Sequence, residues 1–64
     1  MKVTLKDKIE SAHVWIDQES GKPQKTVITG VAGDLLDSDD LGCGDAERAL
    51  SHLVKLDLAE EVAT

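Results

Sequence analysis

Hydrophobic positions repeat most regularly in the second half of the chain, between Leu41 and Val62. Alanine and leucine recur there at spacings of three and four, which places them on one side of a helix. The apolar side, which must be buried, carries Ala46, Ala49, Leu50, Leu53 and Leu56. We predict a helix at about residues 45–57, ended by Asp57, because Asp tolerates the left-handed conformation that terminates helices.

A second helical pattern begins near the N-terminus. Thr4 is a suitable N-cap, and the acidic side chains of Asp7 and Glu10 follow within two turns, which is favourable near the positive end of a helix. Apolar residues then recur at spacings of four, three and four: Leu5, Ile9, Ala12 and Ile16. This pattern predicts a helix at residues 4–18.

A β-hairpin is the alternative for the same segment. Residues 13–17 contain three consecutive side chains that favour sheet: Val14, Trp15 and Ile16. These residues would pair with residues 25–29 across a polar segment that contains Gly21 and Pro23 and is expected to be a loop. The N-cap pattern favours the helix, and the hairpin remains open.

The middle of the chain has a mixed pattern. Residues 26–29 favour strand, whereas the apolar residues of the segment 31–36 suit one face of a helix. We predict a short helix at residues 28–37, although two glycines weaken it by about 1 kcal/mol each. The following segment, 37–40, is expected to be a turn whose side chains cap backbone groups.

These elements predict a single mainly α domain over residues 1–64. It would be a small three-helix, helix-turn-helix fold with at most a short two-stranded element. The predicted core comprises Leu5, Ile9, Ala12, Ile16, Val27, Val31, Leu35, Leu41, Leu50, Leu53 and Leu58. A domain of this size buries only about 60% of its unfolded surface. A homodimer would bury more, so we expect one.

The segment LLDSDDLGCGDAERALSHLVKLDLAEEV resembles the helix-turn-helix core of winged-helix domains. The pair Leu41 and Gly42 falls at the turn, and Leu50, Leu53 and Leu58 fall at core positions of the second half. The resemblance covers roughly residues 26–62. It has two departures: the family usually has glycine where this chain has Asp57, and the sequence ends about six residues after Leu58, so the wing would be reduced or absent.

The resemblance implies a small, dimeric DNA-binding transcription regulator whose partner is duplex DNA. The helix at residues 45–57 would be the recognition helix, and lysines of the first half would contact phosphates. The residues expected to bind DNA or another partner are Arg48, Ser51, His52, Lys55, Lys22 and Lys25.

The charge distribution favours a different partner. The net charge is −6, and it lies in the second half, where two basic residues stand against nine acidic ones. The first half has five lysines and four acidic residues. An acidic half works against DNA binding, which requires several phosphates to be neutralised. The alternative function is therefore an acidic module that binds a basic protein or mimics nucleic acid.

No constellation of residues predicts catalysis, a metal or another cofactor. Cys43 is the only cysteine, which excludes an intramolecular disulfide and a paired-cysteine zinc site and is typical of a reducing, cytoplasmic setting. His13 and His52 have no ligand spacing to each other or to Cys43. A calcium loop starting at Asp37 would place Leu41 and an arginine where oxygen ligands are required. We expect a protein that is neither an enzyme nor membrane-spanning.

Overall fold

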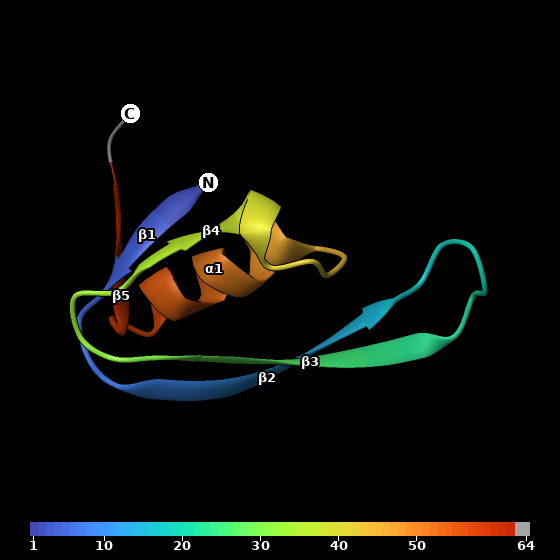
Figure 1. Cartoon of the computed structure of the whole chain (residues 1–64), viewed down its shortest axis with the longest axis horizontal. Coiled ribbons are helices and arrows are strands. Elements are labelled where there is room, and N and C mark those ends of the chain that lie inside the picture. The colour runs from blue at the N-terminus through green and yellow to red at the C-terminus, as the bar shows by residue number, and fades with distance from the viewer. Residues whose placement is uncertain (63–64) are drawn as a thin grey trace.

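The computed structural model describes residues 1–62 and shows five strands and one α-helix in that range (Figure 1). The elements in chain order are β1 (Lys2–Leu5), β2 (Ile9–Ile16), β3 (Pro23–Gly30), β4 (Leu35–Asp37), the short 3-10 helix η1 (Ser38–Asp40), α1 (Ala46–Lys55) and β5 (Ala59–Glu61). The fold is mainly β. The prediction of a mainly α, three-helix, helix-turn-helix domain is therefore wrong.

The strands form two separate antiparallel sheets. One has three strands in the order β4-β1-β5, and the other is the β2–β3 hairpin, whose register runs from Ile9 opposite Gly30 to Ile16 opposite Pro23. Figure 1 shows the hairpin along one side of the molecule and extending beyond the remaining elements. Helix α1 and the three-stranded sheet lie on the same side of that hairpin.

The predicted first helix at residues 4–18 is replaced by β1, a turn and β2. Leu5 and Ile9 are both buried, as predicted, but they belong to different strands. The carboxylate of Asp7 accepts a hydrogen bond from the backbone N–H of Lys8 at 2.8 Å, so this acid stabilises the turn and caps no helix. The hairpin that the sequence left open is the structure that forms, and it is longer than predicted.

The predicted second helix at residues 28–37 is also absent. The β-branched residues before Gly30 extend β3, and a turn then leads into β4. Gly33 has φ +93°, a conformation that interrupts a helix, and its N–H donates to the carbonyl of Leu5 at 2.8 Å. The segment is therefore held against β1 as a strand connection.

The third predicted helix is confirmed as α1, including the way it ends, but Leu56, which was predicted to lie on its buried side, is 55% exposed. Asp57 adopts a left-handed conformation with φ 62°. Its N–H donates to the carbonyl of Val54, and the N–H of Leu58 donates to the carbonyl of Leu53, both at 3.0 Å. This pair of bonds is the Schellman motif, with Asp in the position where glycine is commonest.

The core lies where α1 meets both sheets. Its buried members come from every long element: Val3, Leu5, Ile9, Ile28, Ala49, Leu50, Leu53 and Ala59. Five residues predicted to be in the core are exposed instead: Ala12, Ile16, Val27, Val31 and Leu35. That prediction was wrong because it assumed helical spacing. In a strand, successive side chains point to opposite faces.

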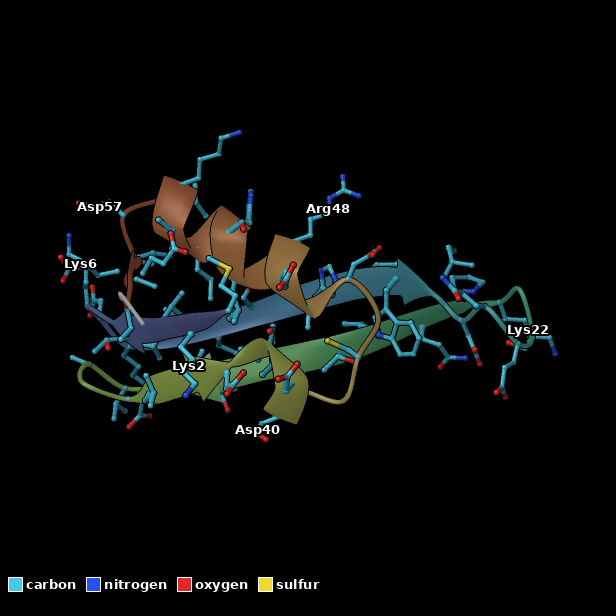
Figure 2. The ribbon with its side chains drawn as sticks, turned by 90° about the horizontal axis from the view of Figure 1, so that it is seen from above. Lys2, Lys6, Lys22, Asp40, Arg48 and Asp57 are labelled. Atoms are coloured by element: carbon cyan, nitrogen blue, oxygen red, sulfur yellow. The ribbon has the colours of Figure 1, made fainter. Side chains whose placement is uncertain are left out.

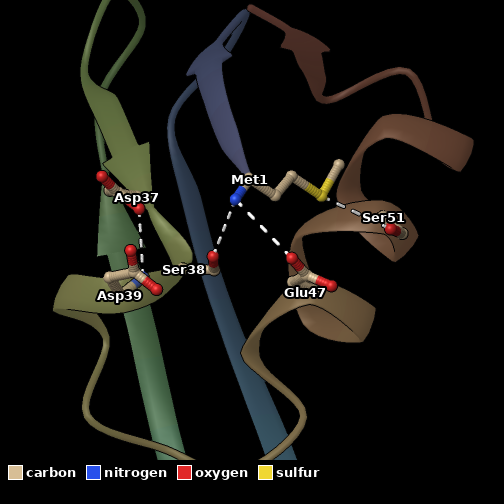
Figure 3. A network of polar contacts seen from close by, with 6 residues as sticks. All are labelled: Met1, Asp37, Ser38, Asp39, Glu47 and Ser51. Carbon is tan, nitrogen blue, oxygen red and sulfur yellow. Dashed lines mark hydrogen bonds and ion pairs between the residues drawn. The ribbon is translucent and has the colours of Figure 1, made fainter.

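A small polar network connects the beginning of β1 to η1 and α1 (Figure 3). The amine of Met1 donates to Ser38 Oγ at 3.0 Å and lies 3.7 Å from Glu47 Oε1. In the same region the Asp37 carboxylate accepts from the N–H of Asp39 at 3.0 Å, which confirms the predicted capping turn. These contacts hold η1 against the first turn of the helix.

Candidate functional site

A groove of about 500 Å³ separates β2 from α1. Its volume is within the range of about 300–1,000 Å³ that is typical of ligand pockets. Strand β2 contributes three consecutive residues, 11–13, and α1 contributes most of its polar face. No residue of β3 lines the groove, so it is the outer edge of β2 that faces the helix.

The helical wall of the groove carries two permanent positive charges. Arg48 and Lys55 line it together with Ser51 and His52, and all four side chains are exposed. They are exposed because the opposite side of α1 is buried in the core, which leaves the polar stripe toward solvent. Figure 2 shows the side chain of Arg48 extending away from the first turn of α1.

The strand wall of the groove is fixed by the inward-facing side chains of β2. Ser11 and His13 are half-buried and line the groove. His13 Nε2 lies 3.1 Å from the carbonyl oxygen of Gly44. Because a carbonyl only accepts, this ring nitrogen carries the proton and donates it. His13 therefore ties β2 to the loop that precedes α1, at one wall of the groove.

The outer edge of β2 presents unpaired backbone groups. Among the described residues β2 pairs only with β3. The N–H of Asp17 donates to the carbonyl of Lys22 at 3.0 Å, which makes this pair, and every second pair before it, the hydrogen-bonded kind. The residues in between, among them Ala12 and Val14, direct their N–H and C=O groups outward. The side chain of Ala12 lies on the far face of the hairpin, so Ala12 contributes its backbone to the groove.

The groove differs in charge from the rest of the molecule. Of the described residues that line it, none is acidic, although the whole chain has a net charge of −6. Arg48 and Lys55 are also the two basic residues of the acidic second half. The groove is therefore a local positive region that would attract carboxylates or other anions.

The structure brings together four of the six predicted site residues. Arg48, Ser51, His52 and Lys55 all line the groove. Lys22 lies in the hairpin loop, at the far end of the molecule (Figure 2), and Lys25 lies on the opposite face of the hairpin; neither lines the groove.

Sequence reasoning missed the contribution of β2. Strict alternation through residues 9–16 would have placed Ser11 and His13 on one face, but the same residues also fitted a helix. The site could therefore be recognised only from the tertiary structure, in which β2 lies beside α1.

Comparison with protein-family models, curated proteins and solved structures finds no match to this chain. No relative therefore tests the resemblance to winged-helix domains. Within residues 1–62, no group of three or more His, Cys, Asp or Glu side chains is placed to hold a metal ion. No helix in that range has the length and apolar character needed to cross a membrane.

Proposed function

We propose that this chain is a protein-interaction module that binds an extended, acidic segment of a partner protein in the groove between β2 and α1. The bound segment would add a strand to the outer edge of β2. The observation that carries the proposal is the meeting, in one groove, of an unpaired strand edge with a helix face that bears Arg48 and Lys55 and no acidic residue.

Strand addition supplies affinity through the backbone. The outward N–H and C=O groups around Ala12 and Val14 would pair with those of the incoming segment, as in other complexes in which a peptide extends an exposed sheet edge. These backbone hydrogen bonds do not depend on which side chains the bound segment carries. Alternate side chains of the segment would point toward α1, and these are the positions at which the module would select its partner.

The helix supplies the selection by charge. Arg48 and Lys55 would meet carboxylates of the bound segment, and the hydroxyl of Ser11 would donate a further hydrogen bond. The net charge of −6 opposes the approach of an acidic segment. This opposition is short-ranged at about 0.15 M salt, where the Debye length is about 8 Å. The local charges of the groove therefore decide the binding.

Fluorescence anisotropy with two labelled peptides tests the proposal. Both peptides alternate valine and threonine over the length of a strand, and one carries glutamates where the other carries lysines. At about 0.15 M salt, we expect the glutamate peptide to bind with a Kd below about 100 μM and the lysine peptide to bind more weakly. Preferred binding of the lysine peptide would instead support the alternative in which the acidic second half binds a basic protein.

Two comparisons separate strand addition from simple charge attraction. Methylating alternate backbone nitrogens of the glutamate peptide should abolish binding in one register and leave it nearly intact in the other, because only one set faces β2. The Arg48→Glu variant should weaken binding about tenfold or more. The Lys22→Glu variant makes the same change in net charge outside the groove and should have little effect. Equal effects of the two variants would contradict the proposed site.

Binding to duplex DNA stays a prediction. The scaffold on which it was based, a helix-turn-helix, is not the fold, but the exposed cations of α1 remain. Fluorescence anisotropy with a labelled random DNA duplex at low salt tests this prediction. DNA binding would show a steep loss of affinity as the salt concentration is raised.

A further inference from the structure

The face of the hairpin that points away from α1 is unusually apolar for an exposed surface. Val14, Ile16 and Val27 are 64%, 57% and 52% exposed, and the exposed side chains of Ala12 and Pro23 lie among them. The register places these residues in adjacent rows, with Ala12 opposite Val27 and Ile16 opposite Pro23. Figure 1 shows the helix and the other sheet on the opposite side of the hairpin, so no described element covers this face.

The molecule also exposes more surface than a compact monomer of its length. Its accessible surface is 4540 Å², whereas a typical folded monomer of this mass exposes about 4,000 Å². Its radius of gyration is 11.7 Å, against about 10.7 Å for a compact domain of 64 residues. The projecting hairpin accounts for both differences. A two-stranded hairpin is marginally stable without a further layer packed on it.

We infer that this apolar hairpin face is the interface of a homodimer, in which two hairpins pack face to face. The argument for a second copy, and not another protein, is charge. The face carries one acidic and one basic residue, Glu10 and Lys25, in the rows on either side of the Ala12–Val27 row and on opposite strands. A two-fold axis that lies between the two faces and crosses this central row, inclined from the Thr29 side of β3 to the Val14 side of β2, places Glu10 of each copy against Lys25 of the other. The face is thus complementary to itself, as a two-fold interface requires.

The packing that this arrangement needs is an ordinary one. Stacked sheets align their strands within about 30° and lie about 10 Å apart. The small side chain of Ala12 at the centre lets the neighbouring valines approach. The groove between β2 and α1 lies on the opposite side of the hairpin, so dimer formation leaves it open. This inference therefore stands or fails independently of the proposed function.

Sedimentation velocity on the whole chain tests the interface. We expect a monomer–dimer equilibrium between about 1 μM and 1 mM and a melting temperature that rises with protein concentration. The Val14→Lys variant should raise the dimer Kd about tenfold or more, because two unpaired charges would be buried. Leu56→Lys replaces a residue that is 55% exposed at the end of α1 and should leave the Kd unchanged. Circular dichroism of both variants serves as the control for folding.

The charge pairing allows a test that misfolding cannot imitate. The Glu10→Lys variant alone places like charges opposite each other, and so does the Lys25→Glu variant, so each should remain monomeric at concentrations where the natural chain dimerises. An equimolar mixture of the two variants should dimerise again, because each supplies the charge that the other lacks. A natural chain that stays monomeric up to about 1 mM, or a mixture that stays monomeric, would overturn the inference.

Discussion

The ring of Trp15 lies directly on the backbone of Gly44, so close that a Cβ at residue 44 would come within 2.7 Å of the ring carbon Cε3. Trp15 Nε1 donates to Thr26 Oγ1 at 3.0 Å, which fixes the ring in place. The carbonyl of Gly44 accepts from His13. Two successive inward-facing side chains of β2 therefore hold the loop that positions α1, and with it one wall of the groove.

Replacing Gly44 by Ala should displace the Trp15 ring. The cost is steric, since Gly44 is not among the residues with positive φ, and we expect a loss of about 1–3 kcal/mol in the free energy of unfolding. Trp15 is the only aromatic side chain, so its fluorescence spectrum reports the displacement directly. The neighbouring Cys43→Ala substitution should change neither the spectrum nor the stability by much. An unshifted emission maximum in Gly44→Ala would show that the loop adapts without moving the ring.

Replacing Leu53 by Ala should largely unfold the domain. Leu53 is 2% exposed at the centre of the core, and its truncation should cost about 2–5 kcal/mol. A chain of this length has a total stability of only about 3–10 kcal/mol. Leu56→Ala is the matched control on the same helix, because Leu56 is 55% exposed and should change stability by less than about 0.5 kcal/mol. Urea titrations of both variants give the comparison.

The helix α1 could be predicted because only one side of it is apolar. Its period, its polar face and its termination at Asp57 are local properties that the sequence carries within about twelve residues. For the same reason four of the six α1 residues that line the groove could be named from the sequence. Their exposure follows from the burial of Leu50 and Leu53, whatever the partner element is.

The sequence favoured a helix over the hairpin because both faces of the hairpin carry apolar residues. A half-buried strand normally alternates apolar and polar positions, but on β2 the exposed positions hold Val14 and Ile16 while the inward positions include Ser11 and His13. The alternation is thereby lost, and the remaining apolar residues happen to fall at helical spacing. If the outward face is an interface, its apolar character has a cause that one chain alone does not reveal.

Replacing Ser38 by Ala should destabilise the contact between β1 and the helix. Ser38 is 9% exposed, and its hydroxyl accepts a hydrogen bond from the Met1 amine. Without this hydroxyl, the half-buried amine retains only the weaker contact with the Glu47 carboxylate. We expect a cost of about 1–3 kcal/mol. Glu47→Gln should cost less than about 1 kcal/mol, because that carboxylate is 76% exposed and 3.7 Å from the amine. Thermal melts that ranked these two variants in the opposite order would make the ion pair the dominant contact.

The ion pair between Lys6 and Asp57 should contribute to stability in a way that depends on pH. Lys6 Nζ lies 2.6 Å from Asp57 Oδ1. This hydrogen bond, reinforced by the negative charge of Asp57, raises the pKa of Lys6 in the folded chain. A raised pKa means that folding favours the charged lysine. The ion pair therefore contributes fully to the free energy of unfolding below the unfolded-state pKa of lysine, about 10.4. This contribution is lost as the pH rises through the higher folded-state pKa.

Asp57→Asn is the variant that isolates this effect. Asparagine retains the tolerance for the left-handed conformation that Asp57 adopts, so the end of α1 should remain intact. Both side chains are well exposed, at 46% and 85%, so solvent screening keeps the difference in melting temperature between variant and natural chain small. That difference should be constant from neutral pH to about 9 and should vanish once the pH has risen above the folded-state pKa of Lys6. A difference that persists in strong alkali would instead assign the role of Asp57 to its backbone conformation.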